Sequence, residues 1–312
     1  MTTFAFVFPG QGSQAVGMLD AWGDNAAVRQ TLQEASDALG EDMAQLIHAG
    51  PKEQLDLTTN TQPVMLTAGI ACYRAWLAET GMAPSVVAGH SLGEYSALVA
   101  AGSLTLADAL PLVRFRAQAM QDAVPVGVGA MAAILGMDAQ AVRDGCAAVA
   151  AATGEAVEAV NFNDPKQTVI AGTKAGVEKA CEALKAAGAK RALPLPVSAP
   201  FHSSLMKPAA ERLRGRLAET TFAAPKIDVI NNIDVTVQGD PAAIRDALYR
   251  QAFGPVRWVE TVQAIRGRGV THVIECGPGK VLAGMVKRID AEAASATIFD
   301  PASLADVKGM LA

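Results

Sequence analysis

Short apolar runs alternate along the chain with longer segments in which apolar residues recur at helical spacing. The runs of strand length are Thr3–Phe8, Ser85–Ala88, Ile227–Asn231 and Thr271–Glu275. The helical segments include Ala26–Leu39, Gln62–Glu79, Leu92–Ala101, Leu104–Asp122, Leu205–Thr220 and Pro241–Gln251. Strands that alternate with helices of this length predict an α/β fold, with a parallel sheet and crossover helices.

The pattern changes between residues 126 and 197. The predicted order there is strand, helix, strand, strand, helix, strand, over Gly129–Met137, Asp138–Ala152, Ala156–Asn163, Gln167–Ala171, Lys174–Ala187 and Lys190–Val197. That order is typical of a ferredoxin-like unit. We therefore expect a ferredoxin-like subdomain over residues 126–197, inserted into a larger α/β domain formed by residues 1–125 and 198–312.

Composition narrows the class of protein. Of the 312 residues, 51% are hydrophobic and 18% are charged, which argues against disorder, and the net charge of −5 gives no support for nucleic-acid binding. The four cysteines lie far apart, which favours free thiols in a reducing compartment over disulfides or a zinc site. No apolar run reaches the ~18 residues of a membrane helix, and the amino terminus resembles a strand rather than a signal peptide. We expect a soluble cytoplasmic protein.

The segment Gly89–Gly93 has the sequence Gly-His-Ser-Leu-Gly, between a predicted strand and a predicted helix. A G-x-S-x-G at such a junction is typical of the nucleophile elbow of α/β-hydrolase-type sheets. The turn is tight, so glycines flank the serine, and Ser91 would project at the carboxyl end of the strand, where α/β folds bind ligands. The motif predicts acyl transfer through a serine ester; the alternative is an ordinary tight turn.

A serine nucleophile needs a base, and the chain has four histidines. His90 adjoins Ser91 and should point away from it. His48 lies near a helix end and His272 lies within a strand. His202 lies in an irregular loop before a helix, where catalytic bases tend to occur. Elimination therefore favours His202, the alternative being an ordinary residue at a helix start.

Other parts of a serine site are less distinct in the sequence. Glu275 and Asp234 are conceivable partners for the histidine, and a backbone carbonyl would serve equally well. One oxyanion donor should be the N–H of Leu92, directly after the serine. The glycine-rich loop after the first strand offers the N–H of Gln11 as the second donor, or else is a plain turn.

Arg116 lies in a predicted helix on a stripe of apolar residues, whereas Arg114 lies on a more polar face. The stripe contains Ala109, Leu112, Val113 and Met120. An arginine on such a face either extends to water or meets an anion. In the serine pocket, its planar fork would bind a carboxylate and select an acyl group that carries one.

Five separated motifs then resemble one family, in the right order and over essentially the whole chain. They are Phe8–Gln14, Thr61–Pro63, Gly89–Gly102, Ala199–Ser203 and Glu275–Lys280. The chain resembles the malonyl-CoA:acyl carrier protein transacylases of type II fatty acid synthesis and the acyltransferase domains of modular synthases. The resemblance implies an α/β-hydrolase-like core with a ferredoxin-like insertion.

The resemblance also implies an activity: transfer of malonyl from malonyl-CoA to the phosphopantetheine thiol of acyl carrier protein, through a malonyl-serine ester. It implies Ser91 as nucleophile, His202 as base and Arg116 as the malonyl clamp, with the N–H groups of Gln11 and Leu92 as the oxyanion hole. The backbone carbonyl near Gln251 would orient the histidine. Gln62, Met120 and Asn161 would line the pocket, and Phe201 resembles the malonyl-selective form of its loop. Gly254, where asparagine is common, departs from the pattern and affects the expected geometry near Gln251.

The resemblance implies no metal and no tightly held cofactor, and we expect a monomer. An acidic carrier protein would need a basic patch, for which the candidates are Lys190, Arg191, Lys207, Arg212, Arg214 and Arg216. The alternative for any of these is a solvated helix face. Three other functions stay open: an acyltransferase for polyketide synthesis, a serine thioesterase or esterase, and a non-catalytic docking subunit. The last should lack Ser91 or His202, and both are present.

Overall fold

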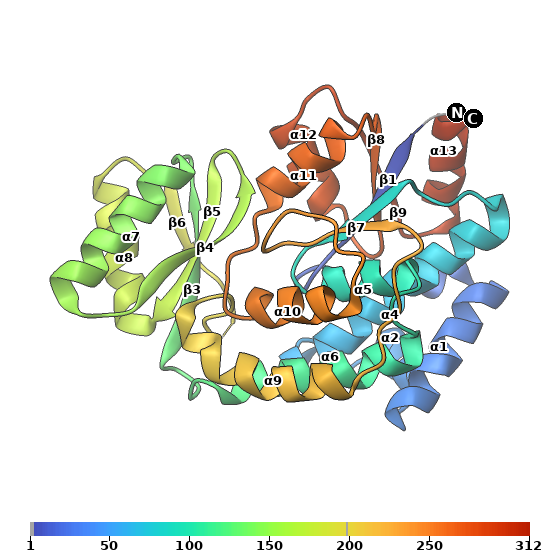
Figure 1. The fold of residues 1–312 in the computed structure, drawn as a ribbon, viewed down its shortest axis with the longest axis horizontal. Helices are drawn as coiled ribbons and strands as arrows, with labels where there is room; N and C mark the ends of the chain where they lie inside the picture. The colour runs from blue at the N-terminus through green and yellow to red at the C-terminus, as the bar shows by residue number, and fades with distance from the viewer. Residues whose placement is uncertain (1–2, 198) are drawn as a thin grey trace.

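The computed structural model describes residues 3–197 and 199–312. The chain forms two sheets, each with its own helices, at opposite ends of an elongated molecule (Figure 1). One sheet is parallel and the other antiparallel, so the predicted α/β fold with a parallel sheet is confirmed. Among the described residues, no helix is long and apolar enough to cross a bilayer.

The parallel sheet has the strand order β7-β2-β1-β8-β9. Its strands are β1 (Phe4–Phe8), β2 (Val86–Gly89), β7 (Asp228–Ile230), β8 (His272–Cys276) and β9 (Ala294–Ile298). Every residue of the central strand β1 is buried, as expected for a strand covered on both faces. β9 was not predicted: it is an edge strand, and four of its five residues are only partly buried.

Helices cover both faces of this sheet. Six match predicted segments: α1 (Ala26–Leu39), α4 (Thr58–Thr80), α5 (Gly93–Ala100), α6 (Leu106–Asp122), α9 (Lys207–Glu219) and α10 (Pro241–Gln251). The others are α2 (Met43–Ala49), α3 (Lys52–Leu55), α11 (Trp258–Gly267), α12 (Val281–Ile289) and α13 (Pro301–Leu311). The long helix α4 is buried along most of its length and packs its aromatic residues edge-on against β1, with Trp76 5.6 Å from Phe6 between ring centroids.

The antiparallel sheet has the order β4-β5-β3-β6. Its strands are β3 (Gly129–Leu135), β4 (Val157–Asp164), β5 (Gln167–Thr173) and β6 (Arg191–Pro194), with helices α7 (Ala139–Thr153) and α8 (Lys174–Ala186) between them in the chain. This is the predicted β-α-β-β-α-β order, and the strand order is the one a ferredoxin-like unit has. The helices cover one face, and the other face packs Met131 and Val169 near Phe201.

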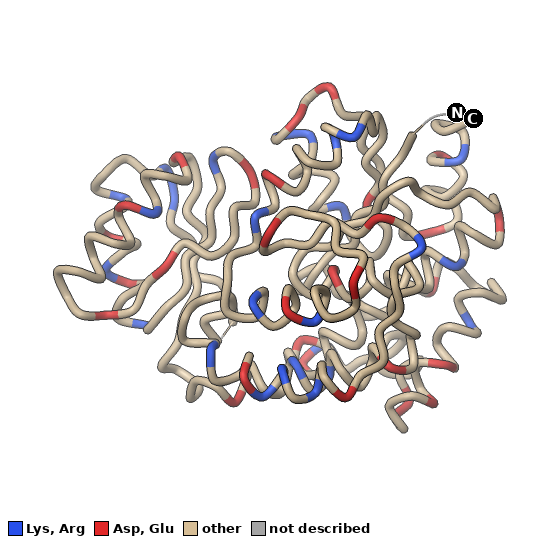
Figure 2. The backbone as a smooth tube through the Cα atoms, in the orientation of Figure 1, with Lys and Arg blue, Asp and Glu red and all other residues tan. Residues whose placement is uncertain are grey.

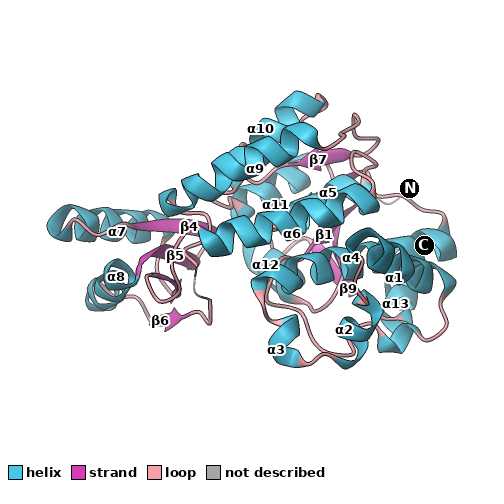
Figure 3. Cartoon of the chain, turned by 90° about the horizontal axis from the view of Figure 1, so that it is seen from below, coloured by secondary structure: helices cyan, strands magenta, loops and turns pink. Residues whose placement is uncertain are grey.

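Strand β4 joins the small sheet to two segments beside the large one, namely Val256 just before α11 and the helix α12. The amide N–H of Phe162 donates to the carbonyl of Val256 (2.9 Å), and the N–H of Val256 donates back to Val160 (2.8 Å). Arg288 on α12 binds Asp164 at the end of β4, Nε to Oδ2 2.6 Å. The small sheet is therefore fixed against the large one, projecting from it as Figure 3 shows from below.

Candidate active site

Ser91 lies on a sharp turn between β2 and α5. Its φ of 53° is in the left-handed region, which is strained for a residue other than glycine. Gly89 and Gly93, which flank the serine, have to be glycines because other backbone segments lie too close to them for a side chain. A Cβ on Gly89 would lie 1.8 Å from the carbonyl carbon of Gly93, and a Cβ on Gly93 would lie 2.1 Å from the carbonyl oxygen of Phe8. The turn therefore has the shape predicted from the motif and aims Ser91 at the carboxyl end of the sheet.

His202 lies against Ser91, with Nε2 2.7 Å from the serine Oγ. Its Nδ1 is 2.9 Å from the backbone carbonyl oxygen of Gln251. Because a carbonyl only accepts, Nδ1 donates, which leaves Nε2 free to accept the serine hydroxyl proton. Burial, and then the positive charge of Arg116, lower the pKa of His202 to about 3. The imidazole is therefore neutral, the state that a general base requires.

The carboxylates considered from the sequence do not touch His202. Asp234 binds Arg250 (2.7 Å), and Glu275 accepts the N–H of Ala283 at the start of α12 (2.9 Å). The backbone carbonyl of Gln251 takes the place of an acid. The departure at Gly254 leaves this contact intact.

The remaining histidines, all within the described residues, lie away from the serine hydroxyl. His90 Nε2 contacts Asn163 Oδ1 on β4 at 2.8 Å, across the junction of the two sheets. His48 binds Asp20 near the end of α2 (2.8 Å), and His272 begins β8. The choice of His202 by elimination agrees with this geometry.

Arg116 points inward from α6 and is only 1% exposed, so it does not extend to water. Its Nη1 donates to Gln62 Oε1 (2.8 Å), and its Nη2 donates to Gln251 Oε1 (3.1 Å) and to Ser91 Oγ (3.2 Å). Burial lowers the pKa of the guanidinium. Among the described residues, no carboxylate forms an ion pair with it. Arg114, on the other face, is paired with Glu41.

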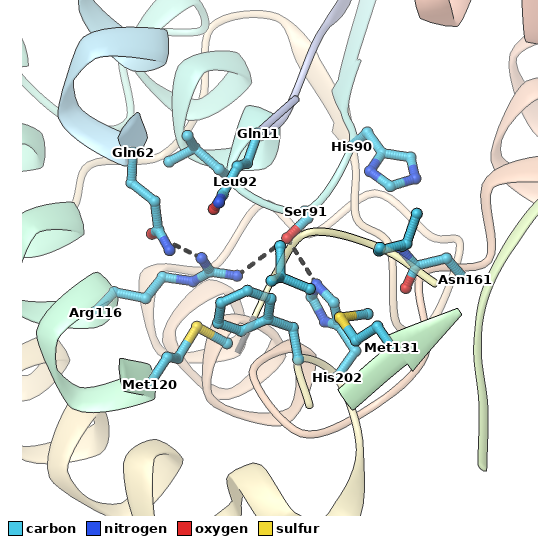
Figure 4. Close-up of a pocket in the computed structure, with 13 residues that line it drawn as sticks. Gln11, Gln62, His90, Ser91, Leu92, Arg116, Met120, Met131, Asn161 and His202 are labelled. Atoms are coloured by element: carbon cyan, nitrogen blue, oxygen red, sulfur yellow. Dashed lines mark hydrogen bonds between the residues drawn. The ribbon is translucent and has the colours of Figure 1, made fainter. Parts of the chain in front are cut away.

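These side chains surround a cavity of about 130 Å³ (Figure 4). It is lined by Gln11, Gln62, His90, Ser91, Leu92, Arg116, Met120, Met131, Asn161, Leu195, Val197, Phe201 and His202. All the proposed site residues from the sequence are here except Gln251, which is buried behind His202 and Arg116. Gln11 and Leu92 lie beside Ser91, with Leu92 at the start of α5, where backbone N–H groups are available to an anion.

Sequence reasoning missed two parts of the site. Met131 on β3, together with Leu195 and Val197 in the segment after β6, lines the cavity from the side of the small sheet. Asn232 holds the turn itself: its Oδ1 accepts the N–H of Ser91 (2.8 Å), and its Nδ2 donates to the carbonyl of Gly89 (2.7 Å). A usable signal was the polar pair that directly follows the strand Asp228–Ile230, because β7 and β2 are neighbours and end at the same edge.

The basic residues considered for a carrier protein do not share one environment. Lys190 and Arg191 lie at the start of β6, while the arginines of α9 pair with acids: Arg212 with Asp122 (3.1 Å) and Arg216 with Glu219 (3.3 Å). Figure 2 shows acidic and basic positions interspersed along α9. That pattern fits a solvated helix face, and the basic patch stays a prediction.

An α/β sheet that carries a serine on such a turn, in contact with a neutral histidine, is the arrangement of enzymes that form acyl-serine esters. Comparison with known proteins agrees with this class. The acyl transferase domain family matches residues 5–301, and the chain belongs to that family.

Its relatives narrow the class further. The malonyl CoA-acyl carrier protein transacylase of Escherichia coli (strain K12) is 53% identical over 306 residues, covering 98% of each chain. The solved acyl-carrier-protein S-malonyltransferase of Burkholderia pseudomallei 1710b is 69% identical, with a TM-score of 0.96 over 98% of this chain and 99% of that one. A malonyl-transacylase solved in complex with a type II polyketide acyl-carrier protein is 50% identical, with a TM-score of 0.95 over 97% of this chain and 98% of that one.

Proposed function

We propose that this chain transfers the malonyl group of malonyl-CoA to the phosphopantetheine thiol of acyl carrier protein, and so supplies malonyl-carrier protein for fatty acid synthesis. The observation that carries the substrate choice is Arg116: a buried guanidinium 3.2 Å from the serine Oγ, held by two neutral amides. A buried cation favours an anionic partner, and its planar fork matches a carboxylate. Malonyl is an acyl group that carries one.

In the first half-reaction, Ser91 Oγ attacks the thioester carbonyl while His202 Nε2 takes the hydroxyl proton. The N–H groups of Gln11 and Leu92 bind the oxyanion, where the loss of one donor typically costs about 10²–10³ in rate. The C–S bond then breaks, and CoA leaves as a thiol with the proton from Nε2. The carbonyl of Gln251 stabilises the transient imidazolium through Nδ1.

The malonyl-serine ester waits with its free carboxylate on Arg116. In the second half-reaction, the phosphopantetheine thiol attacks the ester carbonyl and gives its proton to His202. Ser91 leaves and recovers its hydroxyl proton from the same nitrogen. The two substrates thus use one site in turn, which gives ping-pong kinetics.

The apolar part of the cavity limits the size of the acyl group. Phe201 and Met120 lie in the wall together with Met131 of the small sheet, leaving about 130 Å³. We propose that this wall accepts malonyl and disfavours acyl groups branched next to the thioester. Every proposed catalytic group comes from one chain, so a monomer suffices for the chemistry.

A second candidate acceptor is the carrier protein of a polyketide synthase. The 50%-identical malonyl-transacylase solved with such a carrier favours it, since the same fold serves that acceptor. A thioesterase has less support, because it has no use for a buried cation beside the nucleophile.

Initial rates with malonyl-CoA and a phosphopantetheinylated carrier protein test the proposal. We expect parallel double-reciprocal lines and malonyl-carrier protein as the product, with fatty acid and polyketide carriers compared at equal concentration. Release of free malonate at the same rate with and without carrier would instead identify a hydrolase.

A further inference from the structure

Glu94 is a buried acid beneath the serine turn for which the mechanism above has no use. It lies in the first turn of α5, is 2% exposed and does not line the cavity. Its Oε2 accepts two hydrogen bonds, from the backbone N–H of Asn232 (2.8 Å) and from Nε2 of Gln251 (3.0 Å). Burial raises the pKa of Glu94 to about 7, and Oε2 remains an acceptor in either protonation state.

The two donors to Glu94 are the residues that hold Ser91 from opposite sides. Asn232 accepts the N–H of Ser91 on its side-chain oxygen (2.8 Å), and Gln251 donates through Nε2 to the carbonyl of Ser91 (3.0 Å). A serine at a φ of 53° keeps that conformation only when its surroundings enforce it. One oxygen of Glu94 thus holds Asn232 and Gln251, the two residues that keep Ser91 in this conformation.

Gln251 extends the connection to the other reacting groups. Its backbone carbonyl orients His202 (2.9 Å), and its side-chain Oε1 accepts from Arg116 (3.1 Å). An acceptor at Glu94 requires the NH₂ end of the Gln251 amide to face it. The oxygen end then faces Arg116. A flipped amide would set acceptor against acceptor at Glu94 and donor against donor at Arg116.

We propose that Glu94 is a positioning residue for malonyl transfer. By sharing one oxygen between Asn232 and Gln251, it sets the relative placement of Ser91, His202 and Arg116. The inference rests on the proposed function, since it assigns Glu94 a role in that reaction. It predicts that both acylation rate and malonyl selectivity depend on a side chain that never touches the substrate.

Three substitutions separate the effect of the length of the Glu94 side chain from the effect of its charge. Glu94→Gln keeps an oxygen at the same reach and removes the charge, Glu94→Asp keeps the charge and shortens the reach, and Glu94→Ala removes both. The matched control is Glu275→Gln, because Glu275 is also buried, with a pKa raised to about 7, and accepts a backbone N–H away from the cavity. Each folded variant is mixed with malonyl-CoA or acetyl-CoA, quenched over time, and measured by intact mass to give the acylation rate constant and the KM.

We expect Glu94→Ala and Glu94→Asp to acylate about 10²-fold more slowly, the cost of displacing reacting groups by about 1 Å, with KM changing much less. Their preference for malonyl over acetyl should fall as well. The acylation rate of Glu94→Gln should stay within about tenfold of the parent's rate, and Glu275→Gln should acylate at the parent's rate.

Folded Glu94→Asp with the parent's rate and selectivity would overturn the proposal, as would Glu94→Gln as slow as Glu94→Asp. Should Glu94→Ala fail to fold, the Gln and Asp variants decide the matter alone. A parent chain that forms no malonyl adduct would contradict the proposed function itself.

Discussion

Replacing Arg116 by alanine should remove the selection of malonyl over acetyl while leaving the serine and histidine in place. The guanidinium is 1% exposed and donates to Gln62, Gln251 and Ser91. In the acyl-enzyme, the malonyl carboxylate would take two of its N–H groups. Acetyl has no carboxylate and makes neither contact.

The size of the effect follows from those two contacts. A hydrogen bond to a charged group contributes about 1.5–3 kcal/mol, so two contribute roughly 3–6 kcal/mol. Each 1.4 kcal/mol is tenfold, which gives a loss of about 10²–10⁴ in kcat/KM for malonyl-CoA. Gln62 and Gln251 lose a donor whichever substrate is bound, so that cost cancels in the malonyl-to-acetyl ratio.

The assay is single-turnover acylation with malonyl-CoA and with acetyl-CoA, quenched and measured by intact mass. Arg116→Lys is the matched control: it keeps a positive charge but cannot bridge two amides and a carboxylate with a planar fork, so it should recover only part of the ratio. An Arg116→Ala variant that keeps the parent's malonyl preference would refute the clamp.

Three other outcomes follow from the structure. Because His202 has a pKa of about 3, acylation should stay flat between about pH 8 and pH 5; an acid limb near the ordinary histidine value of 6.5 would contradict this. Gly89→Ala should abolish activity, because the added Cβ would overlap the backbone of Gly93. A Cβ on Gly215, in α9, would meet nothing, so Gly215→Ala should stabilise the chain by about 0.5–1 kcal/mol in denaturant unfolding. The same effect from both substitutions would contradict the close approach at Gly89. The pKa of Glu275, raised from 4.5 to about 7, makes the folded state hold its proton longer than the unfolded one. The free energy of unfolding should therefore fall as pH rises from about 4.5 to 7, and by about 3 kcal/mol less in Glu275→Gln than in the parent. Identical pH dependence in the two proteins would contradict this role for Glu275.

Features with local signatures were predictable from the sequence. The serine turn needs Gly89 and Gly93 because neighbouring backbone leaves no room for a Cβ at either position. The five consecutive residues Gly89–Gly93 therefore show the turn in the sequence itself. The small sheet was predicted because its strands and helices follow one another along the chain in the order strand, helix, strand, strand, helix, strand. His202 stood out because its loop is irregular, whereas His48 and His272 lie in or near regular elements and His90 adjoins the serine itself.

What the sequence left hidden depends on contacts between distant segments. Asn232 lies 141 residues after Ser91, and Glu94 lies 157 residues before Gln251, so no local pattern joins them. The edge strand β9 was missed because an edge needs little buried apolar surface. Met131, Leu195 and Val197 became part of the site only through the docking of β4 on Val256 and α12.

The most direct test of the account is the identity of the acylated residue. The chain is incubated with malonyl-CoA alone, quenched, and measured by intact mass and peptide mapping, and the adduct is then chased with phosphopantetheinylated carrier protein. We predict one malonyl group on Ser91, stable in water, transferred to the carrier, and absent from Ser91→Ala. An adduct that persists in Ser91→Ala, or malonyl transfer without any enzyme-bound ester, would contradict the central claim.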